Sequence, residues 1–467
     1  MTLRALILLV LLVSAASADD ALPLGVQNVL QVRQLPAASL SIHVTDLETG
    51  AVLLDWRAGE PRNPASTMKL LTTLVALDVL GPAYRWTTDV YALGEIRNGK
   101  LDGDLLLKGH GDPFLVTERA WQFVRRIRLE GIDEISGNLI LDDSWFDVGD
   151  YDPGEFDNQP LRAYNVAPNA LLLNFKVVRY WFEPDGSKVA VRVDPPLENL
   201  AVDNRLRVRP GYCGGYQRGI AVNMNETNDT VIFEGRFPAG CERYAMDRTA
   251  LSHDEFNWGL FGLLWREGGG RYSGGWKKGL APEDEEPLLS FHSPSLSEMI
   301  ARINKHSNNV MARQVLYTLA AEVNGPPGTE AGGREVIDTW LAEHGLETCA
   351  LALENGAGLS REARICASAM GAMLNFAWRQ PYMPEFLASM SLSGLDGTLR
   401  RRFEGSELVG QAHLKTGSLD HVSAIAGYLQ SRSGRRFAVV AMQNYEDVHR
   451  GPGEEVQEAL LRWLYEQ

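Results

Sequence analysis

The chain has 467 residues, of which 60 are acidic and 45 basic, and its formal net charge is −15. Hydrophobic residues make up 45% and charged residues 22%, which is ordinary for a soluble globular protein and excludes disorder as a description of the whole chain. The acidic balance argues against nucleic acid as the main partner, because phosphate binding needs a basic face. The length predicts roughly two to four domains.

The N-terminal residues have the composition of a secretory signal peptide. Arg4 precedes the apolar run 5–13, and the A-x-A cleavage pattern follows at 16–18. The run is too short for a transmembrane helix, which needs about 20 residues. We therefore predict a signal peptide over residues 1–18 and an exported, periplasmic product that is soluble or loosely membrane-associated. No later stretch is long and apolar enough for a transmembrane anchor.

The next segment predicts a β-hairpin followed by a helix. Apolar and polar residues alternate over 39–44 and 51–56, with turn residues between them. Asn63 and Pro64 then have the pattern of an N-cap and a first helical residue. Apolar residues spaced three and four apart predict a buried helix that ends at Gly81.

The middle of the chain, from about residue 86 to residue 287, has a different texture. Glycine and short runs of Val, Leu and Ile replace the helical spacing, so this stretch is predicted to be mainly β. Its last part, 268–287, is rich in glycine and acidic residues and is typical of a loop or domain boundary.

Helical spacing returns after Ser295, which forms a capping-box pattern with Glu298. Further helices are predicted over 309–323, 334–344 and 454–465, and strands over 424–430 and 436–443. A short first part and a long last part are therefore expected to build one domain around an insertion.

Four cysteines, an even number in a chain predicted to be exported, indicate disulfides. Three pairings are possible, and proximity in sequence favours Cys213 with Cys241 and Cys349 with Cys366. Buried free thiols are the alternative. The absence of C-x-x-C spacing argues against a zinc or redox motif.

Three short motifs carry the chemistry: S-x-x-K at 66–69, S-x-N at 307–309 and K-T-G at 415–417. Each is a weak signal alone. Their order, and their predicted positions at a helix start, between helices and on a late strand, are far more restrictive. Together they form the motif set of penicillin-binding proteins and serine β-lactamases.

The residue types fit nucleophilic catalysis. Ser66 and Lys69 share a helix face, and Ser66 lies in the first helical turn, where the helix dipole favours developing negative charge. A serine hydroxyl needs an adjacent base, and Lys69 serves as one only when it is neutral. Desolvation or the cation Lys415 is expected to lower its pKa. Ser307 is the candidate proton relay to the leaving amine, and Asn309 the residue that orients Lys69 and the substrate amide.

The K-T-G motif is predicted to lie on a strand that begins near Gln411. An edge strand can pair with an extended peptide. Lys415 and Thr416 would then hold the terminal carboxylate of that peptide. Gly417 is expected to leave room for substrate to approach the backbone. The N–H groups of Ser66 and Ser418 are candidates for an oxyanion hole.

Beyond these motifs, nearly the whole mature chain resembles the class C low-molecular-mass penicillin-binding proteins of the penicillin-binding protein 4 family. The segment G-H-G-D-P at 109–113 resembles that family's G-x-G-D-P, and D-G-T-L at 396–399 matches a segment ahead of K-T-G. N-G-A-G-L-S-R at 355–361 resembles a D-G-S-G-L-S-R loop, with Asn355 and Ala357 as departures.

The resemblance implies both a fold class, α+β or α/β, and an arrangement of domains. A serine β-lactamase/DD-peptidase-like catalytic domain, an antiparallel sheet flanked by helices, is split by two nested, mainly β inserted domains. The long separation of Ser66 from Ser307 agrees with such an insertion. The expected boundaries are residues 19–85 and 288–467 for the catalytic domain, 86–158 and 246–287 for inserted domain II, and 159–245 for nested domain III.

The resemblance also implies an activity. Ser66 would attack the carbonyl of the penultimate D-alanine of peptidoglycan stem peptides, and D-alanine would leave before water hydrolyses the acyl-enzyme. Cleavage of D-alanyl–diaminopimelate cross-links uses the same chemistry. β-Lactams would acylate Ser66 and be hydrolysed slowly. No cofactor and no metal ion are expected.

Two other readings compete. One is a β-lactamase or esterase on the same fold, against which the long insertion and the lack of a second carboxylate motif for fast deacylation weigh. The other is a catalytically inactive wall-binding protein, which would not need a complete motif set. A metallopeptidase is disfavoured because there is no H-E-x-x-H. His306 and His413, which flank two motifs, are expected to be packing or pH-modulating residues.

Overall fold

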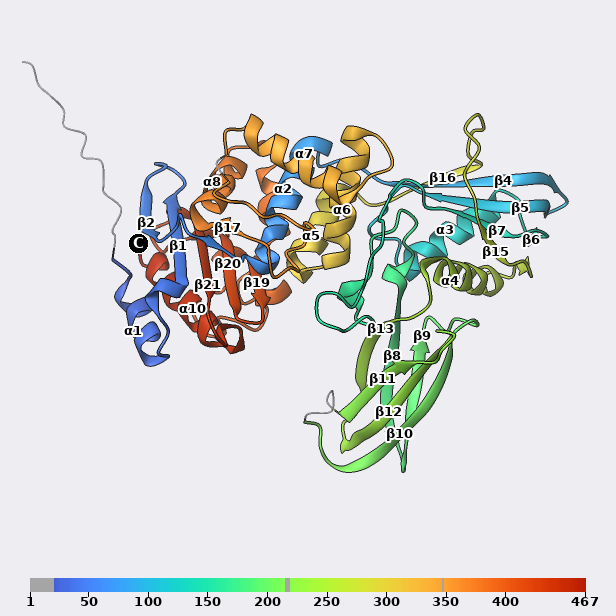
Figure 1. Cartoon of the computed structure of the whole chain (residues 1–467), viewed down its shortest axis with the longest axis horizontal. Coiled ribbons are helices and arrows are strands. Elements are labelled where there is room, and N and C mark those ends of the chain that lie inside the picture. The colour runs from blue at the N-terminus through green and yellow to red at the C-terminus, as the bar shows by residue number, and fades with distance from the viewer. Residues whose placement is uncertain (1–20, 215–218, 347) are drawn as a thin grey trace, which may run out of the picture.

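The computed structural model describes residues 21–214, 219–346 and 348–467. The predicted signal peptide lies outside these described residues. Three large sheets organise the chain, one formed by its two ends and two formed by its middle (Figure 1). None of the helices in the described ranges has the length and apolar character that crossing a membrane would require.

The first sheet joins the two ends of the chain. Blue N-terminal strands lie beside red C-terminal strands in Figure 1, because β1 pairs with β21 in antiparallel register from Leu40–Gln443 to Asp46–Phe437. In order across the sheet, the strands are β18 (Ser391–Leu392), β19 (Ala412–Leu419), β20 (Val422–Gln430), β21 (Arg436–Asn444), β1 (Leu40–Asp46) and β2 (Val52–Trp56). A separate two-stranded pair is formed by β3 (Pro61–Arg62) and β17 (Ile365–Cys366).

Helices cover both faces of this sheet because its strands are apolar on both sides. Ile425 packs into one core cluster with the helices of the chain ends, whereas its neighbours Ala424 and Ala426 pack into another. The end helices are α1 (Leu24–Val32) and α10 (Pro452–Tyr465). The helices of the other cluster are α2 (Lys69–Leu80), α5 (Leu296–His306), α6 (Asn309–Asn324), α7 (Glu330–Glu343), α8 (Ala367–Trp378) and α9 (Met383–Ser389). The predicted antiparallel sheet flanked by helices is confirmed.

The second sheet is built from the first and last parts of the insertion and from β16, which follows the predicted end of the insertion at residue 287. Its path is β14 (Arg271–Tyr272), β6 (Glu134–Ile135), β5 (Lys100–Gly109), β4 (Thr87–Arg97) and β16 (Leu289–His292), with β7 (Leu139–Asp142) and β15 (Trp276–Lys278) attached. Two helices pack on it, α3 (Thr117–Leu129) and α4 (His253–Glu267). The prediction of a mainly β middle overlooked both helices. The capping box of Ser252 and Glu255 at the start of α4 was a readable signal.

The third sheet hangs below the second in Figure 1. Its order is β11 (Ile220–Met224), β12 (Thr230–Gly240), β10 (Ala201–Tyr212), β9 (Lys188–Asp194), β8 (Val177–Asp185) and β13 (Tyr244–Thr249). One apolar cluster is continuous between the second and third sheets, from Phe123 through Phe256 to Phe233. The exact boundaries of the two inserted domains stay a prediction.

Short 3₁₀ turns connect these elements: η1 (Ala37–Ser39), η2 (Ala65–Met68), η3 (Ala163–Asn165), η4 (Asn174–Lys176), η6 (Gly397–Leu399) and η7 (Val448–Arg450). Both favoured disulfides are present. Cys213 is bonded to Cys241 in the third sheet, and Cys349 to Cys366 beside β17.

Candidate active site

Ser66 lies in a tight turn at the start of α2. The predicted regular helix from Pro64 is wrong in this detail, because residues 65–68 form the 3₁₀ turn η2 and the α-helix begins at Lys69. Ala65 has a left-handed φ of 45°, which a regular helix does not accommodate. The Asn63 side chain holds the turn by accepting the N–H of Ala65 at 2.8 Å and donating to the carbonyl oxygen of Ser360 at 2.9 Å.

Lys69 is fully buried beneath Ser66, and three oxygens surround its amine. Its Nζ donates to Ser66 Oγ at 3.0 Å, to Asn309 Oδ1 at 2.5 Å and to the Ala357 carbonyl oxygen at 2.6 Å. A charged amine uses all three N–H donors in these contacts, whereas a neutral amine has two donors and one lone pair. When Lys69 is neutral, the carbonyl oxygens of Asn309 and Ala357 take both donors, and the lone pair then faces the hydroxyl of Ser66.

The surroundings favour that neutral form. Burial lowers the pKa of Lys69 well below its usual 10.5, and the nearby cations Lys415 and Arg313 lower it further. Burial also lowers the pKa of Lys415 to about 7. Desolvation and Lys415 were predicted to act in this direction, whereas Arg313 was not foreseen.

The S-x-N motif forms the junction between α5 and α6. Ser307 ends α5 in the left-handed conformation, with a φ of 55°, and Asn308 begins α6 by accepting the N–H of Met311. This geometry directs Ser307 Oγ to Lys415, whose Nζ donates to it at 2.9 Å. The motif residues on three elements therefore meet in one connected site.

Strand β19 brings the K-T-G motif beside η2. The strand is only partly an edge, because β18 pairs with it at His413 and Leu414 and leaves the side from Lys415 onward open. Thr416 Oγ1 donates to Thr398 Oγ1 at 2.8 Å. The threonine of the D-G-T-L segment therefore contacts the K-T-G motif directly. Ser418 is exposed on the open part of the strand.

The structure gives a reason for glycine at position 417 that differs from the predicted need to leave room for substrate. A Cβ at this position would lie 2.4 Å from the Pro64 carbonyl oxygen and 3.1 Å from the Ser66 nitrogen. The room that glycine provides is therefore occupied by η2 rather than reserved for substrate. Close packing of β19 on η2 sets the spacing between the N–H groups of Ser66 and Ser418.

Two contacts of the site were missed at the level of sequence. The first is the Ala357 carbonyl, which comes from the N-G-A-G-L-S-R loop and needs no particular side chain, so the departure from Ser there leaves the contact intact. The second is Arg313, one helical turn after Asn309 and buried. Its Nη1 donates to the carbonyl oxygens of Tyr164 at 3.3 Å and Val166 at 3.1 Å, which ties the insertion to α6.

The G-H-G-D-P segment also packs against α6. Gln314, the residue after Arg313, donates from Nε2 to the carbonyl oxygens of Gly111 at 3.3 Å and Asn169 at 2.9 Å. Burial raises the pKa of Asp112 to about 6. This segment therefore positions the insertion against the helix that carries Asn309.

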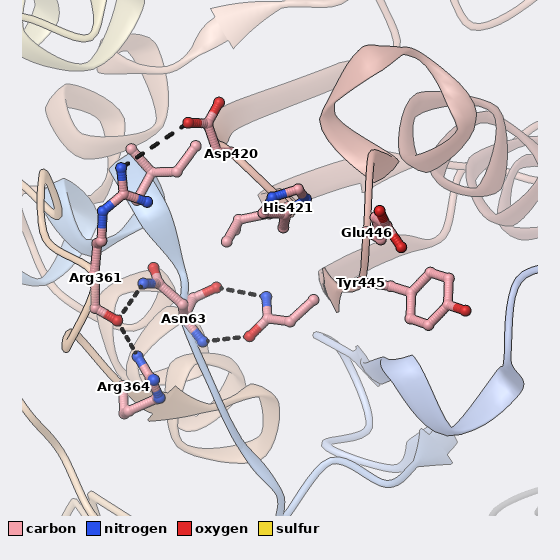
Figure 2. A pocket seen from close by; sticks show the side chains of 10 residues that line it. Asn63, Arg361, Arg364, Asp420, His421, Tyr445 and Glu446 are labelled. Atoms are coloured by element: carbon pink, nitrogen blue, oxygen red, sulfur yellow. Dashed lines mark hydrogen bonds and ion pairs between the residues drawn. The ribbon is translucent and has the colours of Figure 1, made fainter. Parts of the chain in front are cut away.

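A cavity of about 430 Å³ lies beyond the end of β19. Figure 2 shows Arg361 and Asp420 facing each other at its rim, 3.9 Å apart, with Asn63 beneath. Because Asn63 and Arg361 belong to the turn and loop that hold Ser66 and Lys69, the cavity opens next to the catalytic motifs.

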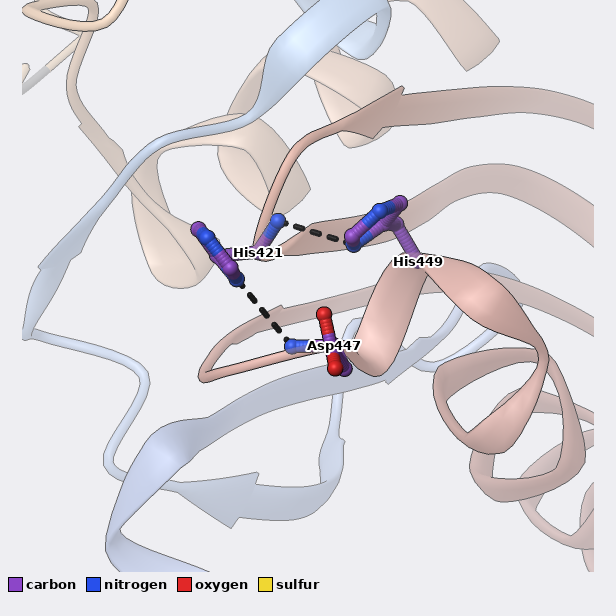
Figure 3. A group of neighbouring side chains, drawn as sticks. All are labelled: His421, Asp447 and His449. Carbon is purple, nitrogen blue, oxygen red and sulfur yellow. Dashed lines mark hydrogen bonds between the residues drawn. The ribbon is translucent and has the colours of Figure 1, made fainter.

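His421, Asp447 and His449 bring possible metal-ligating atoms within 4.8 Å of one another (Figure 3). Their hydrogen bonds disfavour a metal ion. The N–H of His421 donates to Nδ1 of His449 at 2.9 Å, and the N–H of Asp447 donates to Nδ1 of His421 at 3.1 Å. A neutral imidazole that accepts at Nδ1 carries its proton on Nε2, so neither nitrogen offers a free lone pair.

The two flanking histidines lie outside the catalytic contacts. His413 is half-buried on β19, and burial followed by the cation Lys305 lowers its pKa. His306 is exposed at the end of α5 and lines a large cavity beside the S-x-N motif.

Comparison with known proteins places this arrangement in context. Residues 24–467 match the model of the D-Ala-D-Ala carboxypeptidase 3 (S13) family. A D-alanyl-D-alanine carboxypeptidase from Actinomadura sp. (strain R39) is 28% identical over 450 residues, covering 91% of this chain and 81% of that protein. The carboxypeptidase DacB of Haemophilus influenzae is 23% identical over 423 residues, covering 88% of this chain and 87% of that protein.

Solved structures share the fold. The crystal structure of penicillin-binding protein 4 from Haemophilus influenzae has a TM-score of 0.81 at 22% identity and covers 95% of this chain and 99% of its own. The same protein complexed with a β-lactam has a TM-score of 0.76 at 21% identity, covering 95% of this chain and 100% of its own.

Proposed function

The chain belongs to the D-Ala-D-Ala carboxypeptidase 3 (S13) family and is a hydrolase, and we propose that its reaction proceeds through an acyl-enzyme on Ser66. The observation that carries this proposal is the hydrogen bonding of Lys69. Its amine is buried, and its pKa is lowered toward the neutral form. In that form its two donors go to Asn309 and Ala357, and its lone pair faces Ser66 Oγ. Such an amine is a base poised for the serine proton.

In the acylation step, the Ser66 hydroxyl proton passes to Lys69 Nζ while Ser66 Oγ bonds to the carbonyl carbon of the penultimate D-alanine. The N–H groups of Ser66 and Ser418 stabilise the oxyanion that forms. The C–N bond then breaks, and the proton reaches the leaving amine from Lys69 through Ser307. The 2.9 Å contact of Ser307 with Lys415 supports this relay, because it holds the hydroxyl in place.

Recognition of the substrate follows from the open part of β19. A peptide paired with the strand from Lys415 onward would place its terminal carboxylate against Lys415 and Thr416, with Gly417 keeping β19 close to η2. Asn309 retains an amide N–H₂ group for the substrate carbonyl while its oxygen holds Lys69. In deacylation, water attacks the ester carbonyl and gives a proton to Lys69. The bond from the carbonyl carbon to Ser66 Oγ then breaks, and that proton passes to Ser66 Oγ.

The substrate class we propose is peptidoglycan stem peptides, with release of terminal D-alanine and cleavage of D-alanyl–diaminopimelate cross-links. β-Lactams would act as covalent inhibitors. The similar Haemophilus influenzae protein has been crystallised in complex with a β-lactam, which supports this proposal. A substrate of this kind fits a protein exported to the periplasm, where the predicted signal peptide would direct it.

A β-lactamase on the same fold is less well supported. In the described ranges, no carboxylate hydrogen-bonds directly to Ser66 or Lys69. We expect slow deacylation.

The test is direct. Purified protein is incubated with a monomeric pentapeptide and with cross-linked muropeptides, and the products are identified by mass spectrometry. Loss of D-alanine or opening of the cross-link by the wild type, and neither by Ser66→Ala, is expected. Rapid turnover of penicillin without peptide cleavage would favour the β-lactamase instead.

A further inference from the structure

A large groove opens beside the S-x-N motif, on the side of the inserted sheets. It has a volume of about 1240 Å³ and extends from Ser307 and Asn309 to Trp121 on α3. Pockets for small ligands are roughly 300–1,000 Å³. A groove of this size, with catalytic residues at one end, is suited to a polymeric substrate that continues away from the scissile bond.

One face of α3 forms an exposed binding surface. Glu118, Trp121 and Gln122 are spaced three and four residues apart and all face solvent, while the opposite face of the helix is buried. The Trp121 side chain is 49% exposed. It also lines a second hollow on the other side of α3, so its indole forms a ridge between two depressions.

A strained turn also lines the groove. Asn174, Phe175 and Lys176 have left-handed φ values of 44°, 52° and 54° in succession, and Phe175 lines the groove. Such strain persists only when surrounding contacts hold it, and it gathers at functional sites.

The contacts that hold this turn also fix it to α3. The Asn174 side chain accepts the N–H of Thr117, the first residue of α3, at 3.2 Å and donates to the Val177 carbonyl oxygen at 2.9 Å. Lys176 Nζ donates to the Leu251 carbonyl oxygen at 3.0 Å. The turn that carries Phe175 is therefore anchored to the start of the helix that carries Trp121.

The charge of the groove selects among possible occupants. Glu118 and Glu267 line it without an ion pair within 4 Å in the described structure, whereas the charge of Asp194 acts on Arg179. Arg179 is the one lysine or arginine among the described lining residues, and it is paired with Asp247 at 2.7 Å and 2.9 Å. Unpaired carboxylates repel a stem peptide, which itself carries carboxylates.

Resting on the proposed peptidoglycan substrate, we propose that this groove binds the glycan strand, a neutral chain of N-acetylated amino sugars. The C–H face of a sugar ring packs on the electron-rich face of Trp121 or Phe175. Its hydroxyl groups donate to Glu118, Asp194 and Glu267, and Gln122 supplies both a donor and an acceptor. The inserted sheets thus hold the glycan while the first sheet holds the peptide.

The direct test measures binding of a neutral oligomer of N-acetylglucosamine, which stands in for the glycan strand without its stem peptides, by calorimetry with the full mature chain. Trp121→Ala is expected to raise the dissociation constant between roughly threefold and tenfold, which is the range for loss of one aromatic partner. Glu118→Ala is a second variant in the same surface. Tyr212→Ala is the matched control, because Tyr212 is 95% exposed on β10 and does not line the groove.

A second measurement compares kcat/KM on cross-linked fragments that retain their sugars with kcat/KM on the same peptides without sugars. The ratio of the two is expected to fall for Trp121→Ala and to stay unchanged for Tyr212→Ala. Unchanged glycan affinity in Trp121→Ala, no glycan binding by the wild type, or an equal loss of affinity for sugar-free stem peptides would each overturn the proposal. Penicillin acylation, measured in parallel, reports on the proposed function separately.

Discussion

Replacing Gly417 by alanine tests whether close packing of β19 on η2 sets the oxyanion hole. The added Cβ would lie 2.4 Å from the Pro64 carbonyl oxygen, whereas ordinary contact begins at 3.4 Å. The strand must therefore move by about 1 Å relative to Ser66. A displacement of this size costs on the order of 10²-fold in rate, and removal of one oxyanion donor costs about 10²–10³-fold.

We therefore expect Gly417→Ala to lower the second-order rate constant of acylation by about 10²-fold, measured by stopped-flow with a fluorescent penicillin. Gly59→Ala is the matched control, because Gly59 is exposed and a Cβ there meets nothing within 4 Å. Thermal melts establish that both variants are folded. Acylation of folded Gly417→Ala within about threefold of the wild-type rate would refute the reasoning.

Three further predictions follow from the site. Lys69→Met should remain folded but acylate on the order of 10³-fold more slowly in rapid-mixing assays, because the general base is lost; a rate near wild type would exclude Lys69 as the base. The acylation rate should fall at low pH as Lys69 becomes protonated, and above about pH 7 as Lys415 loses the charge that holds the substrate carboxylate. A substrate with a C-terminal amide should not show the fall above pH 7. If the rate with that substrate also falls above pH 7, this role of Lys415 is contradicted. Replacing both Cys349 and Cys366 by alanine should cost about 3 kcal/mol of stability. It should also slow acylation, because this disulfide encloses the loop that carries the Ala357 carbonyl. The same change at Cys213 and Cys241 should affect stability alone, and equal acylation rates in the two double variants would contradict the role of that loop.

Much of the site was readable from side-chain chemistry. Ser66, Lys69, Ser307, Asn309 and Lys415 were identified because each contributes a functional group whose spacing leaves a trace in the sequence. The hydrogen bonds of Lys69 with Ser66 and Asn309 agree with the predicted partnerships, and the pKa of Lys69 shifts in the predicted direction. The contact of Ser307 with Lys415 was not predicted.

The parts that escaped prediction depend on backbone geometry or on long-range packing. The Ala357 carbonyl leaves no mark on residue type, since any residue provides that oxygen. The role of Gly417 became visible only when η2 was seen against β19. The β18 strand is two residues long, too short for an alternating pattern.

The inserted region shows a related limit. Helix α3 buries Ala120, Phe123, Val124 and Ile127, whose spacing is that of an amphipathic helix and could have been recognised in the sequence. The short apolar runs on either side of it favoured strands, so the whole stretch was predicted to be mainly β.

One measurement tests the central claim most directly. The mature protein is treated briefly with benzylpenicillin, digested, and mapped by mass spectrometry, beside Ser66→Ala. The account predicts one penicilloyl adduct on the peptide that contains Ser66, persisting over minutes, and none on the variant. An adduct on another residue, or an equal adduct on Ser66→Ala, would contradict it.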